Sequence, residues 1–341
     1  MYKRRHILFA YSITHFLVDF ACAFLIFRGI VGTADGYLCV LLYNFCAFAM
    51  QMPLGIIADK WNRNFLCAVI GCAFVAAAYG FGRYPAAAVI VAGLGNAMFH
   101  IGGGIDVLNI SEKKLGALGI FVSPGAFGIY FGTMLGRGNS FSAVFIPLAL
   151  IAAAGLIFAL YKARGGAYPQ NAAFALESAG CRHILAACAC LFFVVCLRSY
   201  VGLALDFAWK GRAYWGIALI CAVVLGKITG GFAADSWGPR RTALISLAFA
   251  ALLFLFSALP LAGVMAVLLF NMTMPITLWA MARIFPAAKG FAFGLLSFGL
   301  FLGFLPIYLG IYPPAGAFWL FALAAALSLA LILSGLRKVK A

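Results

Sequence analysis

Residues 55–64 read GIIADKWNRN and residues 231–241 read GFAADSWGPRR, so one unusual signature occurs twice in the chain. Its two aspartates, Asp59 and Asp235, are 176 positions apart, which is just over half of the 341 residues. Each copy closes a long apolar stretch with glycine, aspartate, tryptophan and then arginine. A motif repeated at this spacing predicts an internally duplicated membrane protein built from two similar halves.

The composition excludes a soluble globular protein, because 66% of the residues are hydrophobic and only 9% are charged. Soluble domains carry about 25% charged residues. Apolar runs of about 20 residues, each long enough to cross ~30 Å of hydrocarbon, recur with short interruptions. A segment inside the bilayer must satisfy its own backbone hydrogen bonds, so each run is expected to be a helix. We expect twelve transmembrane helices, at about 7–30, 36–57, 65–82, 86–104, 115–135, 141–162, 183–207, 213–234, 242–259, 263–282, 289–310 and 315–335.

The net charge of +16 is distributed in a way that indicates membrane topology rather than binding to nucleic acid. With the N-terminus placed inside, most of the 24 lysine and arginine residues fall in cytoplasmic segments. External loops hold few basic residues, clearly only Arg83, Arg137, Lys210 and Arg212. This asymmetry follows the positive-inside rule and predicts that both termini are cytoplasmic. The basic excess also favours contact with anionic membrane lipid.

One long polar connection divides the chain into two parts. Residues 1–162 are expected to form an N-terminal six-helix bundle, 163–182 a cytoplasmic connecting loop, and 183–341 a C-terminal six-helix bundle. No P-loop signature occurs, which excludes pumping driven by ATP. Cys188-x-Cys190 lies in an apolar run and its spacing does not suit zinc. No nucleophile–base–acid set is evident, so we expect no enzymatic activity, no cofactor and no metal.

The repeated motif has a chemistry that suits a contact between helices. Gly55 and Gly231 allow neighbouring helix backbones to approach closely. Asp59 and Asp235 sit at a helix C-terminus, where the helix dipole disfavours an anion. We therefore expect each carboxylate to pair with the N-terminus of a neighbouring helix or with arginine. A plain charged turn is the alternative interpretation.

These residues resemble the loop motif between helices 2 and 3 of the major facilitator superfamily, in which a weaker echo follows helix 8. The resemblance implies two six-helix halves that alternate access, and a cytoplasmic latch that helps to hold the outward-facing state. It places in that latch Gly55, Asp59, Arg63, Gly231, Asp235, Arg240 and Arg241.

A second resemblance lies in the fifth predicted helix. Gly119-x-x-x-Ser123-Pro124-x-x-Phe127-Gly128 approximates a pattern associated with antiporters of the same superfamily. It departs from that pattern at Ser123 and Phe127, where glycines are usual. Small residues at helical spacing also suit ordinary helix packing.

Polar and ionisable side chains inside predicted helices are few, and at membrane depth they usually face a cavity or a partner. They include His15, Asp19, Asn44, Gln51, Asn96, His100, Arg198, Lys227, Asn271 and Thr273. Adding 176 to a position in the first half gives its expected counterpart: Gln51 maps to Lys227, Asn96 to the neighbour of Asn271, and Asp19 to position 195, one turn before Arg198. Recurrent polar positions are expected to converge at the interface of the two halves.

The charges suggest separate roles for the two halves. Arginine can bind a carboxylate or phosphonate bidentately and lysine acts as a point charge, so we expect Arg198 and Lys227 to bind an anionic substrate. The expected substrate site also includes uncharged polar side chains, namely Asn44, Gln51, Asn96, Asn271 and Thr273. The alternatives for Arg198 are an internal ion pair with Asp19 or Asp206, or an anchor at the lipid interface.

Asp19 is the expected proton carrier, with His15 and His100 as relays, because histidine titrates closest to neutral pH. A histidine on a helix can also simply bond a backbone carbonyl. The chain resembles the fosmidomycin-resistance-like branch of the superfamily in two stretches, His15-x-x-x-Asp19 and Ala97-Met98-Phe99-His100. In that branch Pro-Glu usually follows the second histidine, whereas here Ile101-Gly102 follows. That resemblance implies proton-driven export of small anions across a bacterial inner membrane.

The sequence therefore predicts a proton-coupled secondary transporter that exports a small organic anion by alternating access. Its partners are the anionic substrate, protons and membrane lipid, without nucleic acid, and the protein is expected to be a monomer. Two alternatives remain open. One is a proton-coupled importer of a carboxylate or phosphonate. The other is a membrane protein that keeps the fold without transport.

Overall fold

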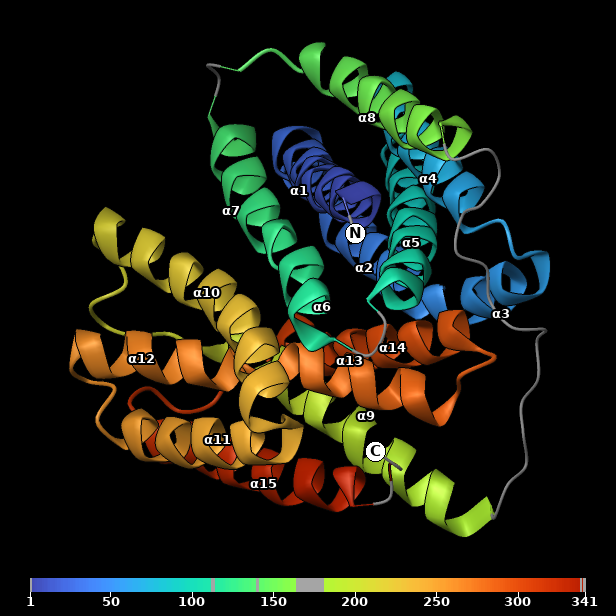
Figure 1. The fold of residues 1–341 in the computed structure, drawn as a ribbon. Coiled ribbons are helices and arrows are strands. Elements are labelled where there is room, and N and C mark those ends of the chain that lie inside the picture. Colours follow the sequence, from blue (N-terminus) through green and yellow to red (C-terminus); the bar gives the residue numbers. More distant parts are fainter. Residues whose placement is uncertain (1, 112–113, 139–140, 164–180, 338, 340–341) are drawn as a thin grey trace. The chain divides into compact units, whose positions relative to one another are not determined.

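A computed structural model describes residues 2–111, 114–138, 141–163, 181–337 and 339. Within these ranges the chain is helical and contains no β-strand (Figure 1). The first half contains α1 (Tyr2–Gly29), α2 (Gly36–Asn44), η1 (Phe45–Ala49), α3 (Gln51–Trp61), α4 (Asn64–Ala78), η2 (Tyr79–Phe81), α5 (Pro85–Ile110), α6 (Leu115–Val122), α7 (Pro124–Arg137) and α8 (Phe145–Lys162). The second half contains α9 (Cys181–Ala204), α10 (Ala213–Trp237), α11 (Pro239–Leu255), α12 (Pro260–Asn271), α13 (Thr273–Ile284), α14 (Lys289–Tyr308) and α15 (Phe318–Leu336).

Eleven helical stretches of the described chain are long and apolar enough to cross a membrane. The segment predicted at 242–259 corresponds to α11, which has 17 residues. At 1.5 Å per residue it is about 26 Å long, short of the ~30 Å hydrocarbon core. The sequence prediction of transmembrane helices is thus confirmed for eleven, and the total of twelve stays a prediction.

Several membrane spans are interrupted, which the sequence prediction did not resolve. The span from Gly36 to Trp61 consists of α2, the π-helical turn η1 and α3. The span from Leu115 to Arg137 breaks between α6 and α7 at Pro124, because proline lacks the N–H that would continue the helix. Such irregular turns inside a span are tolerated where protein groups bond the freed carbonyls.

The contacts of the chain define two compact units. Unit 1 comprises residues 1–112, 124–175 and 287–298, and unit 2 comprises 113–123, 176–286 and 299–341. Unit 2 therefore includes α6, and unit 1 includes the first half of α14. Of the connection expected at 163–182, residues 164–180 lie outside the described residues.

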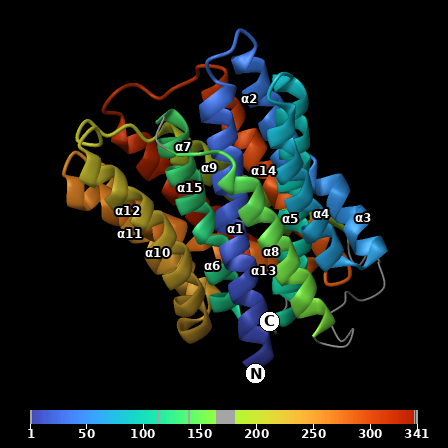
Figure 2. The ribbon, with the colours of Figure 1, turned by 90° about the horizontal axis from the view of Figure 1, so that it is seen from above.

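Unit 1 is built around α1. This helix packs along α7, with α5 and α8 also against it, and α4 packs on α5 (Figure 2). The close approach of α1 and α7 requires glycine, because a Cβ at Gly128 would overlap the backbone oxygen of Phe16 and one at Gly132 that of Phe20.

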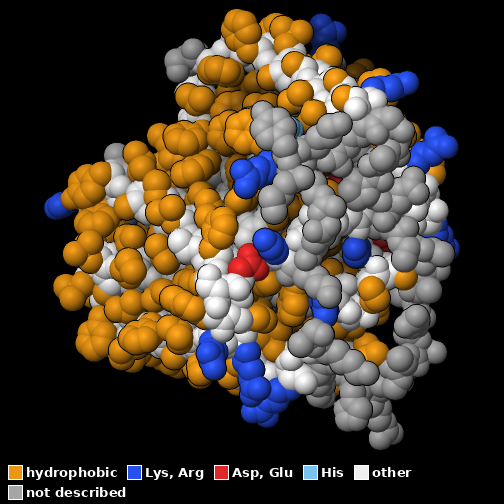
Figure 3. Space-filling view, in the orientation of Figure 1, with side chains coloured by type: hydrophobic (Ala, Val, Ile, Leu, Met, Phe, Trp, Pro, Cys, Tyr) orange, Lys and Arg blue, Asp and Glu red, His pale blue; other side chains and the backbone are white. Residues whose placement is uncertain are grey.

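In unit 2, α10 packs against α6 and α12, and α15 packs against α9 and α11. Large apolar side chains of α11, among them Leu244, Phe249 and Leu252, are exposed. Apolar side chains also cover most of the visible face over α10, α11 and α12 (Figure 3). Extended apolar exposure of this kind is unusual for a water-soluble surface and suits contact with lipid.

Candidate functional site

The first copy of the repeated motif anchors a helix N-terminus in unit 1. Oδ1 of Asp59 accepts a hydrogen bond from the N–H of Gly290 at 2.8 Å, and Oδ2 accepts one from Phe291 at 2.9 Å. Both donors belong to the first turn of α14, where unsatisfied amides and the helix dipole favour an anion. Gly55 allows the contact, because a Cβ there would overlap the backbone of Gly290.

The second copy repeats this arrangement in unit 2. The carboxylate oxygens of Asp235 accept hydrogen bonds from the N–H groups of Leu115 at 2.7 Å and Gly116 at 2.9 Å, at the start of α6. A Cβ at Gly231 would lie 2.6 Å from the backbone oxygen of Leu115. The partners in the motif are thus helix amides in both copies. The arginines expected in the latch, Arg63, Arg240 and Arg241, are exposed.

The duplication extends beyond the motif to Gln51 and Lys227, which were predicted to be equivalent. A Cβ at Gly294 would overlap the backbone oxygen of Gln51, and a Cβ at Gly119 would lie 2.5 Å from that of Lys227. The two glycines are 175 positions apart, so the contact of α3 with α14 in unit 1 is repeated by the contact of α10 with α6 in unit 2. Gln51 and Lys227 therefore occupy equivalent positions in these two helix contacts.

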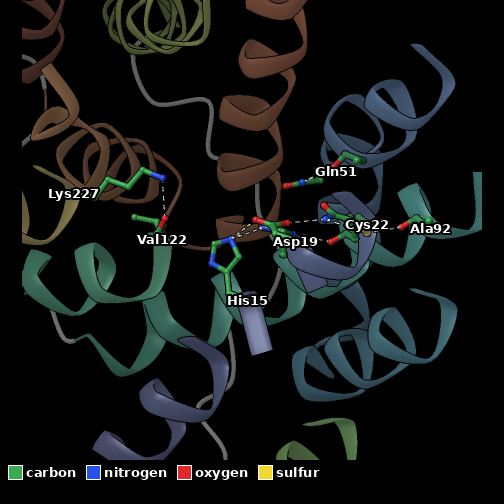
Figure 4. Close-up of polar contacts among 10 residues, drawn as sticks. His15, Asp19, Cys22, Gln51, Ala92, Val122 and Lys227 are labelled. Atoms are coloured by element: carbon green, nitrogen blue, oxygen red, sulfur yellow. Dashed lines mark hydrogen bonds and ion pairs between the residues drawn. The ribbon is translucent and has the colours of Figure 1, made fainter. Parts of the chain in front are cut away.

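Lys227 bonds the end of α6, where the span is interrupted. Its Nζ donates to the backbone oxygen of Val122 at 3.0 Å (Figure 4). Beside it, the hydroxyl of Ser123 lies within hydrogen-bond distance of the carbonyls of Gly119 at 2.5 Å and Val224 at 3.2 Å. A lysine and a hydroxyl thus satisfy groups around the break before Pro124.

For the first helices the constant spacing of 176 was wrong. Gly128 and Gly303 occupy equivalent places, and their Cβ atoms would approach Cβ of Asp19 at 3.1 Å and of Ser199 at 2.6 Å, respectively. The counterpart of Asp19 is therefore Ser199, beside Arg198, and not position 195. The interval from Asp19 to the motif aspartate Asp59 is four residues longer than the interval from Ser199 to Asp235. Insertions in connections change such spacing without changing the packing of the helices.

Asp19 lies in a buried cluster formed by α1 and α5 in unit 1. His15 Nε2 lies 3.2 Å from Asp19 Oδ2 and 2.9 Å from His100 Nε2. Asn96 Nδ2 donates to Asp19 Oδ1 at 2.9 Å, and His100 Nε2 lies 3.7 Å from the same oxygen (Figure 4 labels His15 and Asp19). All four side chains are buried. Gly125 of α7 leaves room for the cluster, because a Cβ there would overlap both Asp19 Oδ2 and His15 Nε2.

The hydrogen bonds assign the tautomers of the two histidines when both imidazoles are neutral. His100 Nδ1 lies 2.9 Å from the backbone oxygen of Asn96, and a carbonyl only accepts, so Nδ1 carries the proton. Nε2 of His100 is then an acceptor, and Nε2 of His15 donates toward it. The N–H proton on Nε2 of His15 thus lies within hydrogen-bond distance of both His100 Nε2 and Asp19 Oδ2.

The same three side chains offer one nitrogen or oxygen ligand each, all within 4.8 Å of one another, a spacing at which they could hold a metal ion. A tetrahedral zinc ion with Zn–N near 2.0 Å separates its ligand atoms by about 3.3 Å. The two histidine nitrogens are 2.9 Å apart, which is a hydrogen-bond distance. The arrangement therefore suits a shared proton better than a metal.

The remaining amide and hydroxyl side chains mostly bond their own helices. Within the described chain, three buried amide oxygens have no hydrogen-bond partner: Gln51 Oε1, Asn64 Oδ1 and Asn96 Oδ1. Gln51 follows the π-helical turn η1, and such turns are frequent at functional sites. The local bonds run from Asn44 to Val40, from Gln51 to Ala47, from Asn271 to Val267 and from Thr273 to Phe270.

Arg198 is the buried cation among the described residues of unit 2. Its side chain is buried, and Nη1 donates to the hydroxyl of Thr277 at 3.4 Å. Thr277 in turn donates to the carbonyl of Met274 at 2.9 Å. Asp206, one of the acids considered as an ion-pair partner, is exposed. Among the described residues of unit 2, no carboxylate lies within 4.0 Å of the guanidinium.

Sequence reasoning missed two residues of these networks. Asp106 is fully buried and accepts a hydrogen bond from the hydroxyl of Tyr11 at 2.6 Å. It was missed because the predicted helix ended at 104, whereas α5 continues to Ile110. Thr277 was also missed. A threonine in an apolar run gives no signal until its neighbour on another helix is known.

Three solved structures resemble the chain over nearly its whole length. A single-residue variant of the Escherichia coli fucose:proton symporter FucP matches with a TM-score of 0.66 and 13% identity, covering 98% of each chain. FucP in the outward conformation matches with a TM-score of 0.65 and 14% identity, covering 97% of this chain and all of FucP. The human organic anion transporter MFSD10 (TETRAN) matches with a TM-score of 0.70 and 13% identity, covering 96% of this chain and 99% of MFSD10.

The chain has the major facilitator fold. No family model and no curated protein matches its sequence. The major facilitator fold together with the eleven apolar spans makes the chain a multi-pass membrane protein. The predicted resemblance to the major facilitator superfamily is thereby confirmed at the level of the fold. The arrangement of twelve helices in two six-helix halves and the finer likeness to the fosmidomycin-resistance-like branch stay predictions.

Proposed function

We propose that this protein is a secondary active transporter that moves a small organic anion, coupled to protons, by alternating access. The observation that carries the proposal is Arg198, a buried cation for which the described part of unit 2 supplies no carboxylate. An ionised side chain away from water is costly unless an opposite charge and hydrogen bonds compensate it. An anion taken up from solution provides that compensation.

The chemistry of Arg198 indicates the kind of anion. Thr277 contacts Nη1, so the edge formed by Nε and Nη2 is the one that can present two parallel donors. Such an edge matches a carboxylate or a phosphonate. Lys227 is the second proposed cation, and an anion would replace a neutral carbonyl as its acceptor. The resemblance to a structure described as an organic anion transporter supports this substrate class.

The cluster of Asp19, His15 and His100 is the proposed proton site. A proton added to it converts an imidazole into an imidazolium 3.2 Å from a carboxylate, which forms a buried ion pair. The pair stabilises the added proton and leaves the cluster without net charge. Resemblance to a structure described as a proton symporter supports coupling of this kind.

The remaining polar residues are proposed to shape the substrate site. Gln51 Oε1 and Asn96 Oδ1 are buried acceptors that suit hydrogen-bond donors of a substrate. Asn44, Asn271 and Thr273 are proposed to contribute further polar groups to the substrate site. The carboxylates of Asp59 and Asp235 are proposed to act as gates, because their bonds to helix amides must break if those helices separate.

We further propose export by a monomer in a bacterial inner membrane, with two six-helix halves and both termini in the cytoplasm. The stretch from Gly119 to Gly128, which approximates the antiporter pattern, favours export. A proton-coupled importer is the second candidate, because the matched FucP structure is described as a symporter. Transport measured in right-side-out and inverted vesicles under the same pH gradient separates the two.

The test of anion binding is ligand-induced stabilisation of the purified protein. Benzoate, lactate, succinate and methylphosphonate form the panel. A ligand at 100 times its Kd stabilises the folded state by about 2.7 kcal/mol, so at least one anion is expected to raise the Tm of the wild type. Arg198→Ala is expected to abolish that rise, and Arg212→Ala, which removes an exposed cation of unit 2, is expected to keep it. An unchanged rise in Arg198→Ala would refute the proposal.

A further inference from the structure

Two buried side-chain amides of unit 1 each have an acceptor oxygen to spare. Gln51 and Asn96 are both 1% exposed, and among the described residues Gln51 Oε1 and Asn96 Oδ1 have no hydrogen-bond partner. The amide nitrogens fix the orientation of the two groups. Gln51 Nε2 donates to the carbonyl of Ala47 at 2.6 Å, and Asn96 Nδ2 donates to Asp19 Oδ1 at 2.9 Å. Turning either amide over would set its oxygen against another acceptor, so the unpartnered atom is an acceptor in both residues.

Gln51 and Asn96 lie at the same level of two packed helices. α3 and α5 are separated in the chain by the single span of α4 and therefore run in the same direction. They are in register near Gly93, because a Cβ there would lie 3.2 Å from the backbone nitrogen of Ala47. Gln51 follows Ala47, and Asn96 follows Gly93, by about one helical turn. We call these two side chains the amide pair.

The third buried amide oxygen without a partner belongs to a different part of unit 1. Asn64 Nδ2 donates to Asp106 Oδ1 at 3.0 Å. Asp106 follows Asn96 by ten residues on α5, which corresponds to about 15 Å of rise. Asn64 is therefore not a member of the amide pair.

The charges around the amide pair favour a neutral donor over an ammonium group. Asp19 is the anion beside Asn96, and both of its oxygens have close partners, Asn96 Nδ2 at 2.9 Å from Oδ1 and His15 Nε2 at 3.2 Å from Oδ2. The backbone of α7 also closes on Asp19, because a Cβ at Gly125 would overlap Oδ2. An ammonium group at the pair would set its charge against uncharged amide oxygens, which is costly away from water. A hydroxyl group matches them without that cost.

We infer that the transported anion is hydroxylated, and that Gln51 Oε1 and Asn96 Oδ1 accept hydrogen bonds from its hydroxyl groups. The inference rests on the proposed function, in which Arg198 binds the anionic group. A bound hydroxyl supplies the donor that the two buried oxygens lack in the described chain. An analogue without the hydroxyl leaves these acceptors unpaired, and sites built to bond a hydroxyl reject such analogues for that reason. The amide pair is thus a determinant of specificity.

The test compares pairs of anions that differ by one hydroxyl group, using the purified full-length protein and isothermal titration calorimetry. The pairs are propionate and lactate, succinate and malate, benzoate and 4-hydroxybenzoate, and methylphosphonate and hydroxymethylphosphonate. In the pair that binds most tightly, the hydroxylated member is expected to have a Kd lower by about tenfold, the size of one hydrogen bond. Equal Kd values in that pair would overturn the inference. Tighter binding of the amino analogue (alanine, aspartate or aminomethylphosphonate) would overturn the choice of a hydroxyl.

Gln51→Met and Asn96→Leu test the two acceptors. Each substitution keeps the approximate volume of the side chain and removes the amide oxygen, so at least one of them is expected to abolish the tenfold preference for the hydroxylated anion. If both variants keep the preference, the amide pair does not bind the hydroxyl. The comparison in the wild type needs no variant and therefore decides the question even where a variant fails to fold.

Thr14→Val is the matched control. It removes a buried hydroxyl of unit 1 that donates to the carbonyl of Ala10 at 2.8 Å, one turn back on its own helix, as Gln51 Nε2 does. This variant is expected to keep the preference. Its loss would show that the preference reports the packing of unit 1, and would overturn the assignment to the amide pair.

Arg198→Ala separates this inference from the proposed function. If the variant loses binding of both members of a pair and the wild type shows no preference between them, only the further inference fails. If both members bind to Arg198→Ala as they bind to the wild type, the proposed anion site fails. If none of the anions binds to the wild type, the proposed function fails and the inference fails with it.

Discussion

At the residue scale, the contacts of Asp19 come from two helices of unit 1. Its carboxylate is bonded by His15 and Asn96, and His100 completes the cluster. The sequence placed Asp19 and His15 one turn apart on one face, and Asn96 and His100 likewise. It could not show that the two faces meet, because that depends on how α1 and α5 pack. The sequence also could not predict that Gly125 of α7 leaves room for the cluster.

Asp19→Asn is expected to uncouple transport from the proton gradient. The amide mimics a permanently protonated acid, so anion exchange at equal pH persists while accumulation driven by a pH gradient disappears. Proteoliposomes loaded with the anion that stabilises the wild type provide both measurements. Full gradient-driven accumulation in this variant would show that Asp19 does not couple.

Gly125→Ala is expected to disrupt the same cluster without changing a charge. The added Cβ overlaps Asp19 Oδ2 and His15 Nε2, and overpacking of this kind costs roughly 1–3 kcal/mol. We expect a lower Tm and lost proton coupling. Gly155→Ala is the matched control, because a Cβ at Gly155 of α8 meets nothing within 4 Å. Equal effects of the two substitutions would contradict the packing described for Gly125.

At the element scale, each motif aspartate joins one helix to the first turn of another. In unit 1, α3 is joined to α14, and in unit 2, α10 is joined to α6. The sequence predicted a helix N-terminus or an arginine as partner, and the helix amides form both bonds. The helix dipole disfavours a carboxylate at a helix C-terminus, so the sequence predicted that each aspartate has a partner. Which helix supplies it depended on the close approach permitted by Gly55 and Gly231.

Asp59→Asn is expected to weaken the anchor of α14 while anion binding survives. The amide of asparagine is uncharged and has one acceptor oxygen, so it cannot replace both carboxylate oxygens of Asp59. Charge-assisted hydrogen bonds contribute about 1.5–3 kcal/mol each. The transport rate is expected to fall and the Kd of the bound anion to stay within a few-fold. Asp235→Asn is expected to behave in the same way, because its contacts repeat those of Asp59. Asp206→Asn, at an exposed acid, serves as the control. Normal transport in both motif variants would contradict a gating role.

At the scale of the whole molecule, the distribution of basic residues predicts a topology that labelling can test. Ala34→Cys is expected to react with a membrane-impermeant thiol reagent from outside the cell, and Lys60→Cys only from inside. Lys60 is preferable to its neighbour Asn62, whose φ of 53° is rarely adopted by other residues. The native cysteines that are described are buried or intermediate, which keeps the background low. The reverse labelling pattern would overturn the predicted orientation.

The sequence alone determined the class of the protein, its apolar spans and its internal duplication. Composition and the length of apolar runs decide these properties locally, because every backbone group in the bilayer must bond within its own helix. The doubled motif then indicated the fold. The sequence also identified five of the six aspartate, histidine and arginine side chains that are buried in the described chain, because such residues are rare in apolar runs.

The tertiary structure alone decided which of these residues meet. It brought the four polar residues of α1 and α5 together, placed the first turn of α6 on Asp235, and aligned Asp19 with Ser199 rather than with position 195. It also revealed Asp106 and Thr277. The physical reason is that contacts between helices depend on close-packed surfaces and on glycines at the crossing points. Residues far apart in sequence create these surfaces together, so no local pattern encodes them.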